Sequence, residues 1–442
     1  MLFSLPLILF SAAAVTKAQA LPGTDSSSSN DENPSNKILS SSWYDSKPSR
    51  PSMIHIIVLV HGWCGAPNEM GYIGAELERQ YQEILHSSAS SPSHKRDKIV
   101  LVHSATCNDG RTHDGIEPGG KRLAQEVNQL VVELTTHYSE QFPTTTISFV
   151  GNSMGGLYAR YALSEIQWTI SNEHADSTDS LFEESSSSSV PVTIIPHLFV
   201  TTATPHLGVA SYTYLPIPRL LEVAIARVMG ASGRDLFRVS NIIDEMTTSA
   251  KFLGPLQQFR KRIAFANCYG TDFQVACETA AFLSGDDTPK THRIIEKRVL
   301  HPTSNGCDGS IVLIVETPRR CQTLEAEDSS QVISVDRLDD VALTTKLDSM
   351  GWTKVFCSVQ RSIPNVFAVE RDTGIDIPEG EYLASVDLLH SKLTRRHHVR
   401  QLPIGHTVLV ANEKDRISKL LNKGGRPIMD ELAKIILGNL DL

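Results

Sequence analysis

The segment from Thr144 to Ile166 constrains the fold more than any other part of the sequence, because it predicts a strand, a tight turn and a helix in direct succession. Thr144–Val150 (TTTISFV) is rich in β-branched residues, and Leu157–Ile166 has helical spacing. Between them, Gly151–Gly155 (GNSMG) fits G-x-S-x-G, whose flanking glycines permit a sharp turn. Such a turn holds the serine hydroxyl at the positive end of a helix. Ser153 is therefore a candidate nucleophile, and the plain alternative is a helix-capping serine.

Strand-like and helical segments alternate along the chain. Met53–Val60 (MIHIIVLV) is a β-branched apolar run, which is typical of a strand buried on both faces of a parallel sheet. Gly120–His137 has the apolar spacing of a helix. Further strands are predicted at Ile194–Thr202 and, from weaker patterns, at Ile263–Asn267, Ile311–Val315 and Thr407–Ala411. The alternation predicts an α/β fold with a mostly parallel sheet, which places its chemistry at the carboxyl ends of the strands.

A serine hydroxyl needs a neighbouring base and donors for the oxyanion before it can attack a carbonyl group. His61-Gly62-Trp63 directly follows the first predicted strand, so this loop should face the turn that carries Ser153. The backbone amides of Trp63 and Met154 are the candidate oxyanion donors. His61 is interpreted as a structural residue of the loop, because it precedes the serine in sequence.

Four stretches, VLVHGWCGAPNEM, HDGIEPGGKRLAQEV, ISFVGNSMGGLYARYAL and LFVTTATPHLGV, carry a family resemblance. From Ile54 to about Leu207 the chain resembles the putative serine esterase family of lipase-like α/β-hydrolases. Beyond Leu207, only KRIAFANCYGTDFQV and the segment around His406 are similar. The serine-rich insertions and Cys64 in the oxyanion loop depart from the family pattern. The resemblance implies the α/β-hydrolase fold and a catalytic order of Ser, Asp and His.

The resemblance also suggests which residues are the acid and the base. The family's acid lies in a segment that corresponds here to ANCYGTD, which makes Asp272 the candidate acid. Asp308, in NGCDG, is the alternative acid, and both could instead be ordinary turn residues. The family places a histidine before a late apolar segment, as His406 is placed here. The competing histidines are His390, His397 and His398.

These residues together predict a hydrolase that cleaves carboxylic esters through an acyl-serine intermediate. Lipid acyl esters are the leading substrate class because the resemblance is to lipases, and small soluble esters, thioesters and acyl transfer to an alcohol remain open. We expect no cofactor and no metal, and contact with a membrane surface follows from the lipid substrate. The alternative is a catalytically silent α/β-hydrolase scaffold that binds lipid or a protein partner.

The charge pattern offers little support for other binding functions. A formal net charge of −9 without a long basic block argues against a nucleic-acid partner. Gly115–Lys121 fits the first seven positions of a phosphate-binding loop, but Arg122 occupies the position of the required Ser or Thr. We therefore predict the entry to a helix there rather than a nucleotide site.

The N-terminal residues predict a secretory protein, and the placement of the polar segments predicts a single folded domain. An apolar run before Ala18-Gln19-Ala20 predicts a signal peptide over residues 1–20, with an uncleaved anchor as the alternative. A polar linker follows over 21–52, and one domain covers 53–442 with insertions near 86–98 and 171–189. The expected location is secreted or lumenal, and the oligomeric state is open.

Two smaller expectations concern cysteines and a helix. The seven cysteines suit a secretory protein, and Cys64–Cys107 and Cys307–Cys321 are candidate disulfides. Leu220–Met229 (LLEVAIARVM) predicts an amphipathic helix, interpreted first as a core helix and second as a cap over an acyl-binding groove.

Overall fold

The computed structural model describes 51–87, 98–138, 144–170, 192–210, 212, 218–269, 272, 275–283, 292–297, 309–320, 339–359, 362–363 and 404–440. Several sequence predictions lie outside these residues. They are the signal peptide, nearly all of the linker, most of both insertions, the alternative acid Asp308, the pair Cys307–Cys321, and His390, His397 and His398.

The described strands form one mostly parallel sheet in the order β2-β1-β3-β5-β6-β9-β8-β7, with β4 paired to β5 off this path. The strands from β2 to β9 in this order run parallel, while β8 and β7 continue the sheet antiparallel. The bounds are β1 Met53–Val60, β2 Lys98–Ser104, β3 Thr144–Asn152, β4 Thr169–Ile170, β5 Val192–Thr202, β6 Lys261–Tyr269, β7 Arg293–Lys297, β8 Ser310–Glu316 and β9 Thr353–Ser358. The predicted parallel α/β architecture is confirmed.

The central strands are buried on both faces, as β1 illustrates. Ile54, Ile56 and Val58 contribute to one apolar cluster, whereas the intervening Ile57 and Leu59 contribute to a second. Because successive side chains of a strand point to opposite faces, the two clusters lie on opposite sides of the sheet. This burial on both faces explains why nearly all residues of the strand are apolar.

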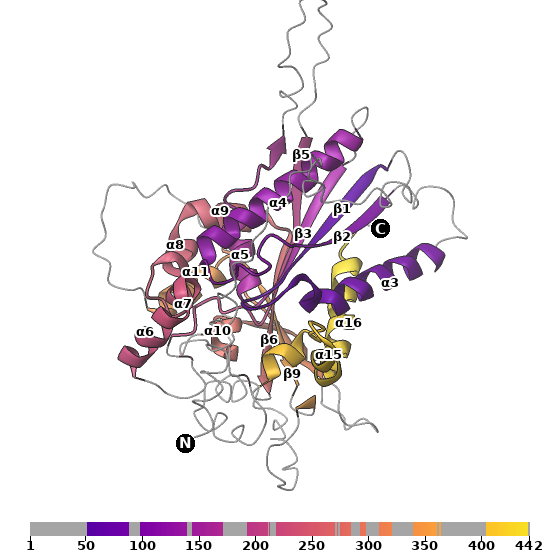
Figure 1. The fold of residues 1–442 in the computed structure, drawn as a ribbon. Coiled ribbons are helices and arrows are strands. Elements are labelled where there is room, and N and C mark those ends of the chain that lie inside the picture. Colours follow the sequence, from indigo (N-terminus) through magenta and orange to yellow (C-terminus); the bar gives the residue numbers. More distant parts are fainter. Residues whose placement is uncertain are drawn as a thin grey trace, which may run out of the picture.

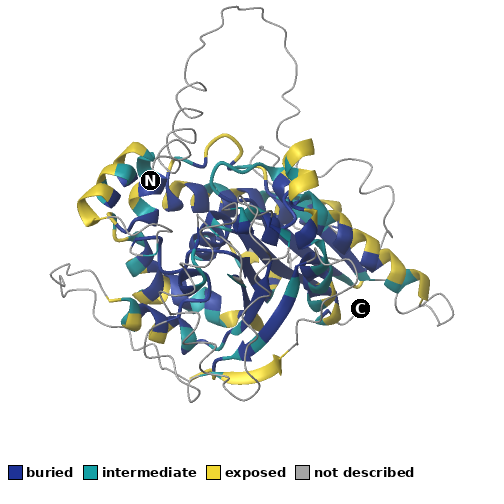
Figure 2. Cartoon of the chain, turned by 90° about the horizontal axis from the view of Figure 1, so that it is seen from below, coloured by how far each residue is buried: buried dark blue, intermediate teal, exposed yellow. Residues whose placement is uncertain are grey.

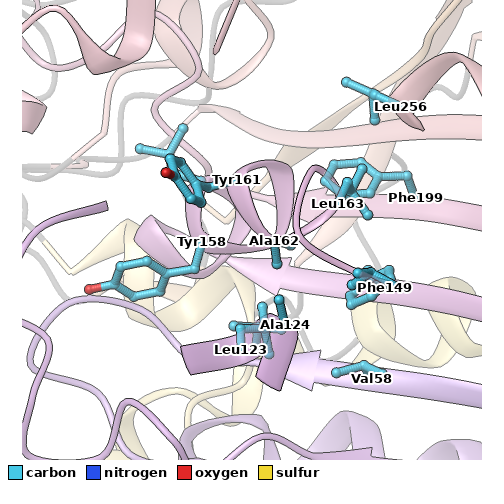
Figure 3. Packing of buried hydrophobic residues seen from close by; sticks show 14 of the residues in the cluster. Val58, Leu123, Ala124, Phe149, Tyr158, Tyr161, Ala162, Leu163, Phe199 and Leu256 are labelled. Carbon is cyan, nitrogen blue, oxygen red and sulfur yellow. The ribbon is translucent and has the colours of Figure 1, made fainter. Parts of the chain in front are cut away.

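Helices cover both faces of the sheet (Figure 1). On one face, α4 (Ile116–His137), α5 (Met154–Ala162) and α9 (Ala250–Gln258) pack against the strands, and Figure 3 shows Leu123 of α4 and Tyr158 of α5 in this layer. On the other face lie α3 (Gly71–Ser87) and α16 (Arg426–Gly438), which pack against each other. The shorter helices are η2 Pro67–Met70, α6 Arg219–Val228, α7 Gly230–Leu236, α8 Ile242–Thr248, α10 Cys277–Ala280, α11 Asp340–Asp348, α14 Gly405–Leu409, α15 Arg416–Leu421 and η5 Lys423–Gly425.

The exposed surface is concentrated on the outer sides of these helices, while the strands in the middle of the molecule are buried (Figure 2). No helix in the described ranges is both long enough and apolar enough to span a bilayer.

Three sequence predictions are wrong in this structure. Thr407–Ala411 was expected as a strand, but Gly405–Leu409 forms the short helix α14. The core-helix interpretation of Leu220–Met229 fails because Leu220 is 86% exposed and only Glu222 and Ala226 of α6 are buried. Cys64 and Cys107 do not form a disulfide: both thiols are free, and the Cys64 sulfur lies 3.7 Å from Nε2 of His113.

Candidate active site

Ser153 occupies the sharp turn that the sequence predicted between strand and helix. β3 ends at Asn152 and α5 begins at Met154, so Ser153 alone makes the connection. Its backbone has φ 54° and ψ −127°, a conformation that costs a non-glycine residue about 1–3 kcal/mol. The Ser153 N–H donates to the carbonyl of Thr202 over 2.8 Å, which ties the turn to the neighbouring strand β5. The surrounding structure thus holds Ser153 half-buried in a strained conformation at the carboxyl edge of the sheet.

The loop after β1 lies directly against Ser153. A Cβ atom at Gly62 would lie 2.7 Å from the Cβ of Ser153, so the backbone can come this close only because the residue is glycine. Trp63 follows at once, and Met154 is the first residue of α5, whose N–H therefore has no carbonyl partner within the helix. Met154 thus directly follows Ser153 in sequence, and Trp63 follows the glycine that lies against Ser153.

Contacts with the loop after β2 fix this oxyanion loop. The Trp63 indole donates to Nδ1 of His113 over 3.1 Å, and the Cys64 N–H donates to the Thr112 hydroxyl over 2.9 Å. His61 is buried, and its Nδ1 lies 3.1 Å from the carbonyl oxygen of Gly62. His61 thus packs within its own loop. Burial raises the pKa of the Cys64 thiol, an effect that outweighs the opposing charge of Lys414 and keeps the thiol neutral.

A buried polar chain supports the turn from behind, and the sequence analysis did not find it. The side-chain amide of Asn152 donates to the carboxylate of Glu69, and the Thr202 hydroxyl donates to Oδ1 of Asn152 over 3.0 Å. All three side chains are buried. Because Asn152 directly precedes Ser153, these contacts fix the approach to the turn. In the sequence, the only sign of these contacts was the polar residue Asn152 in the first variable position of G-x-S-x-G.

The candidate acid and base come together at the same edge of the sheet. Asp272 lies three residues after β6, and it forms an isolated antiparallel bridge with Ile404, two residues before His406. Oδ2 of Asp272 lies 3.7 Å from Nδ1 of His406, and each side chain is 6% exposed. This separation is longer than a hydrogen bond. The other Asp272 carboxylate oxygen accepts from the Val275 N–H over 2.9 Å.

Further contacts join the segment after His406 to the oxyanion loop. The Lys414 ammonium donates to the carbonyl of Cys64 over 2.5 Å, and the Asn68 amide donates to the Lys414 carbonyl over 2.7 Å. Because β3 and β6 both pair with β5, Ser153 and Asp272 follow strands only two places apart in the sheet. The structure thus brings the turn at Ser153, the loop after β1, Asp272 and the segment around His406 to one edge of the sheet.

The loop after β2 is stabilised by a buried carboxylate. Glu126 accepts from the N–H groups of Thr106 and Cys107 over 2.9 Å, and it lies 3.0 Å from Nε2 of His103. Burial alone would raise the pKa of Glu126, but these hydrogen bonds outweigh it and lower the pKa to about 2. No three His, Cys, Asp or Glu side chains within the described ranges are grouped to hold a metal ion.

A strained serine between a parallel strand and a helix, with a glycine loop against it and an Asp–His pair at the same edge, defines the α/β-hydrolase class. Residues 50–282, more than half of the chain, match the family model described as putative serine esterase (DUF676), and the protein belongs to this family. The matched range includes Ser153 and Asp272 but ends before His406.

Two named relatives each match about half of the chain. A putative lipase of Schizosaccharomyces pombe is 30% identical over 223 residues, which cover 48% of this chain and 24% of the relative. A putative lipase of Saccharomyces cerevisiae is 23% identical over 219 residues, covering 48% and 28%. The chain thus spans about a quarter of the length of these relatives. Among solved structures, a Bacillus licheniformis lipase in its propeptide form is 16% identical, with a TM-score of 0.27, covering 51% of this chain and 37% of the other.

Proposed function

We propose that this protein hydrolyses carboxylic esters through an acyl-enzyme on Ser153, with His406 as the base and Asp272 as the acid. The observation that carries the proposal is the strained turn at Ser153, because a strained serine between a strand and a helix is what the G-x-S-x-G motif requires of a nucleophile. Family membership supports the reaction class, and the Asp272–His406 pair supplies the remaining chemistry.

The proposed reaction begins with a proton transfer. Since Asp272 faces Nδ1 of His406, the imidazole Nε2 is left to accept the proton of the serine hydroxyl. The serine oxygen attacks the acyl carbonyl carbon, and the tetrahedral intermediate collapses as the alcohol leaves with the proton from His406. A water molecule then attacks the acyl-serine while His406 accepts its proton, which releases the carboxylic acid and restores the serine.

The negative oxygen of each tetrahedral intermediate would be stabilised by the N–H groups of Trp63 and Met154. Such donors act strongly because they are already in position before the charge develops. The contacts of Trp63 with His113 and of Cys64 with Thr112 support this role by fixing the loop.

We propose lipid acyl esters as the substrate class. The named relatives are putative lipases, and the chain shares about half of its length with them. Short soluble esters use the same chemistry and serve as convenient probes.

Labelling with a fluorophosphonate tests the proposal directly, because the probe reacts only with an activated serine. We expect labelling of the wild type and none of Ser153→Ala. His406→Ala and Asp272→Asn should slow labelling by roughly 10³–10⁴-fold, by analogy with other triads. Asp308→Asn is the matched control and should label at the wild-type rate.

Hydrolysis of esters with short and long acyl chains completes the test. Folded wild-type protein that neither labels nor turns over any ester would refute the hydrolase proposal and leave a silent lipid- or partner-binding scaffold. If Asp308→Asn loses labelling while Asp272→Asn retains it, the acid assignment is wrong.

A further inference from the structure

Helix α15 shows large aliphatic side chains to solvent. Ile417 is 71% exposed, Leu420 is 64% exposed and Leu421 is 45% exposed, and no residue of this helix is buried. Residues separated by three and four positions share one face of a helix, so the three side chains form a single apolar face. Removing such a face from water lowers the free energy. Within the described residues, none of the three side chains belongs to a buried apolar cluster.

Basic residues surround this apolar face. Five basic and two acidic residues lie between Glu413 and Arg426, although the whole chain has a formal net charge of −9. Glu413 pairs with Lys419 and Arg426, and Asp415 caps the helix by accepting from the Ser418 N–H over 2.8 Å. Because both acids are occupied locally, Arg416 and Lys423 present positive charge beside the aliphatic side chains. Such a combination fits a surface with anionic headgroups above apolar chains.

The helix is joined to the segment that carries the candidate base. Asn422 follows α15 directly, and its side chain is buried. Its Oδ1 accepts from the Thr407 hydroxyl over 3.0 Å, and its side-chain amide donates to the backbone carbonyl of Asn412 over 3.2 Å. Thr407 is the residue after His406. Lys414, just before the helix, contacts the oxyanion loop at Cys64. The apolar face therefore lies beside the site rather than on a remote part of the surface.

A second helix, α6, also exposes aliphatic residues: Leu220 is 86% exposed and Val228 is 72% exposed. Figure 1 shows α6 beside α7 and apart from α15, so the apolar face of α15 is a separate surface.

We propose that α15, with Ile417, Leu420 and Leu421 inserted and Arg416 and Lys423 beside them, docks the protein on an anionic lipid surface. This inference rests on the proposed function in one respect, namely that a lipid ester must reach Ser153 from that surface. The helix then places the entrance of the site against the layer in which the acyl chains lie.

Flotation with lipid vesicles tests this proposal without any turnover. The full chain should bind vesicles of phosphatidylcholine with phosphatidylglycerol more tightly than vesicles of phosphatidylcholine alone. Binding should weaken at about 1 M salt, where charges are screened beyond about 3 Å. Ile417→Ser combined with Leu420→Ser should lower the partition coefficient at least about ten-fold. Arg416→Gln combined with Lys423→Gln should lower binding to the anionic vesicles by about five-fold for each charge.

Val132→Ser is the matched control, because Val132 is 47% exposed near the end of α4, which leads to the opposite edge of the sheet. It should bind vesicles as the wild type does. Equal binding by the Ile417→Ser, Leu420→Ser variant would overturn the proposal, and so would a wild type that ignores anionic vesicles. A lipid-free dimer that this variant abolishes would instead identify a second copy as the partner.

The two proposals can fail separately. Ser153→Ala should bind vesicles like the wild type, so loss of turnover leaves the docking result readable. Conversely, fluorophosphonate labelling in the absence of vesicles does not depend on α15.

Discussion

At the scale of single residues, the site depends on close backbone approach more than on unusual side chains. Gly62 and Ser153 come from different loops, yet a Cβ at one would lie 2.7 Å from the Cβ of the other. The strained turn of Ser153 is held by a hydrogen bond to Thr202 and by the contacts of Asn152. The position of Ser153 therefore depends on residues that would take no part in the reaction.

Gly62→Ala should impair catalysis without unfolding the protein. The added methyl group must push the oxyanion loop away from the serine, and a displacement of about 1 Å can cost about 100-fold in rate. We expect a fall of that order in kcat for a short-chain ester, with a smaller change in KM. Gly71→Ala is the control, because a Cβ at Gly71 meets nothing within 4 Å. Wild-type kcat in Gly62→Ala would show that the loop does not serve the oxyanion.

The sequence predicted some residues of the site better than others. The sharp turn at Ser153 was predictable because the strand, turn and helix patterns reinforce one another around it. Asp272 and His406 needed the family resemblance, since an isolated Asp or His in a loop has no pattern of its own. Their placement side by side agrees with that expectation, while their catalytic roles stay a prediction. The buried Glu69 could not be foreseen, because its partner Asn152 is adjacent only in space.

At the scale of elements, short helices and strands were the hardest to predict from the sequence. Thr407–Ala411 is β-branched and apolar, and periodicity cannot separate a short buried helix from a strand. The segment is buried in the cluster with α16, so it is apolar for a reason unrelated to strand formation. β9 was not predicted because Lys354 interrupts it. That lysine is fully buried, forms a 2.8 Å ion pair with Asp348 and lies over the ring of Phe282.

The position of α14 should be sensitive to a single methyl group. A Cβ at Gly425 would lie 1.7 Å from the carbonyl oxygen of Val408, so Gly425→Ala must separate η5 from the helix that carries His406. We expect unfolding in urea to require about 1–3 kcal/mol less free energy, together with a lower kcat. Gly438→Ala is the matched control, since nothing lies within 4 Å of a Cβ there. Unchanged stability and kcat in Gly425→Ala would show that α14 tolerates displacement.

At the scale of the whole molecule, buried histidines couple stability to pH. Burial lowers the pKa of His55 to about 3, with a further contribution from His197. Burial likewise lowers the pKa of His292 to about 3, beside Lys354, and holds the pKa of His206 well below its usual value. These side chains stay neutral in the folded protein but take up protons in the unfolded chain below about pH 6.5.

Stability should therefore fall as the pH drops from about 6.5 towards 3. Each such histidine contributes up to about 1.4 kcal/mol per pH unit over this range. Urea unfolding at several pH values measures how steeply the free energy of unfolding changes with pH. His55→Gln should reduce this slope by the contribution of one histidine. A free energy of unfolding that does not change between about pH 6.5 and pH 4 would contradict the prediction.

The family match ends at residue 282, but the sheet continues beyond it through β9, β8 and β7. A protein cut at that boundary would leave β6 as a long apolar edge, open to pairing with another molecule and hence to aggregation. The segment beyond residue 282, which closes this edge, also carries His406 and the apolar helix α15. Its loss would therefore expose the sheet to aggregation and remove the candidate base at the same time.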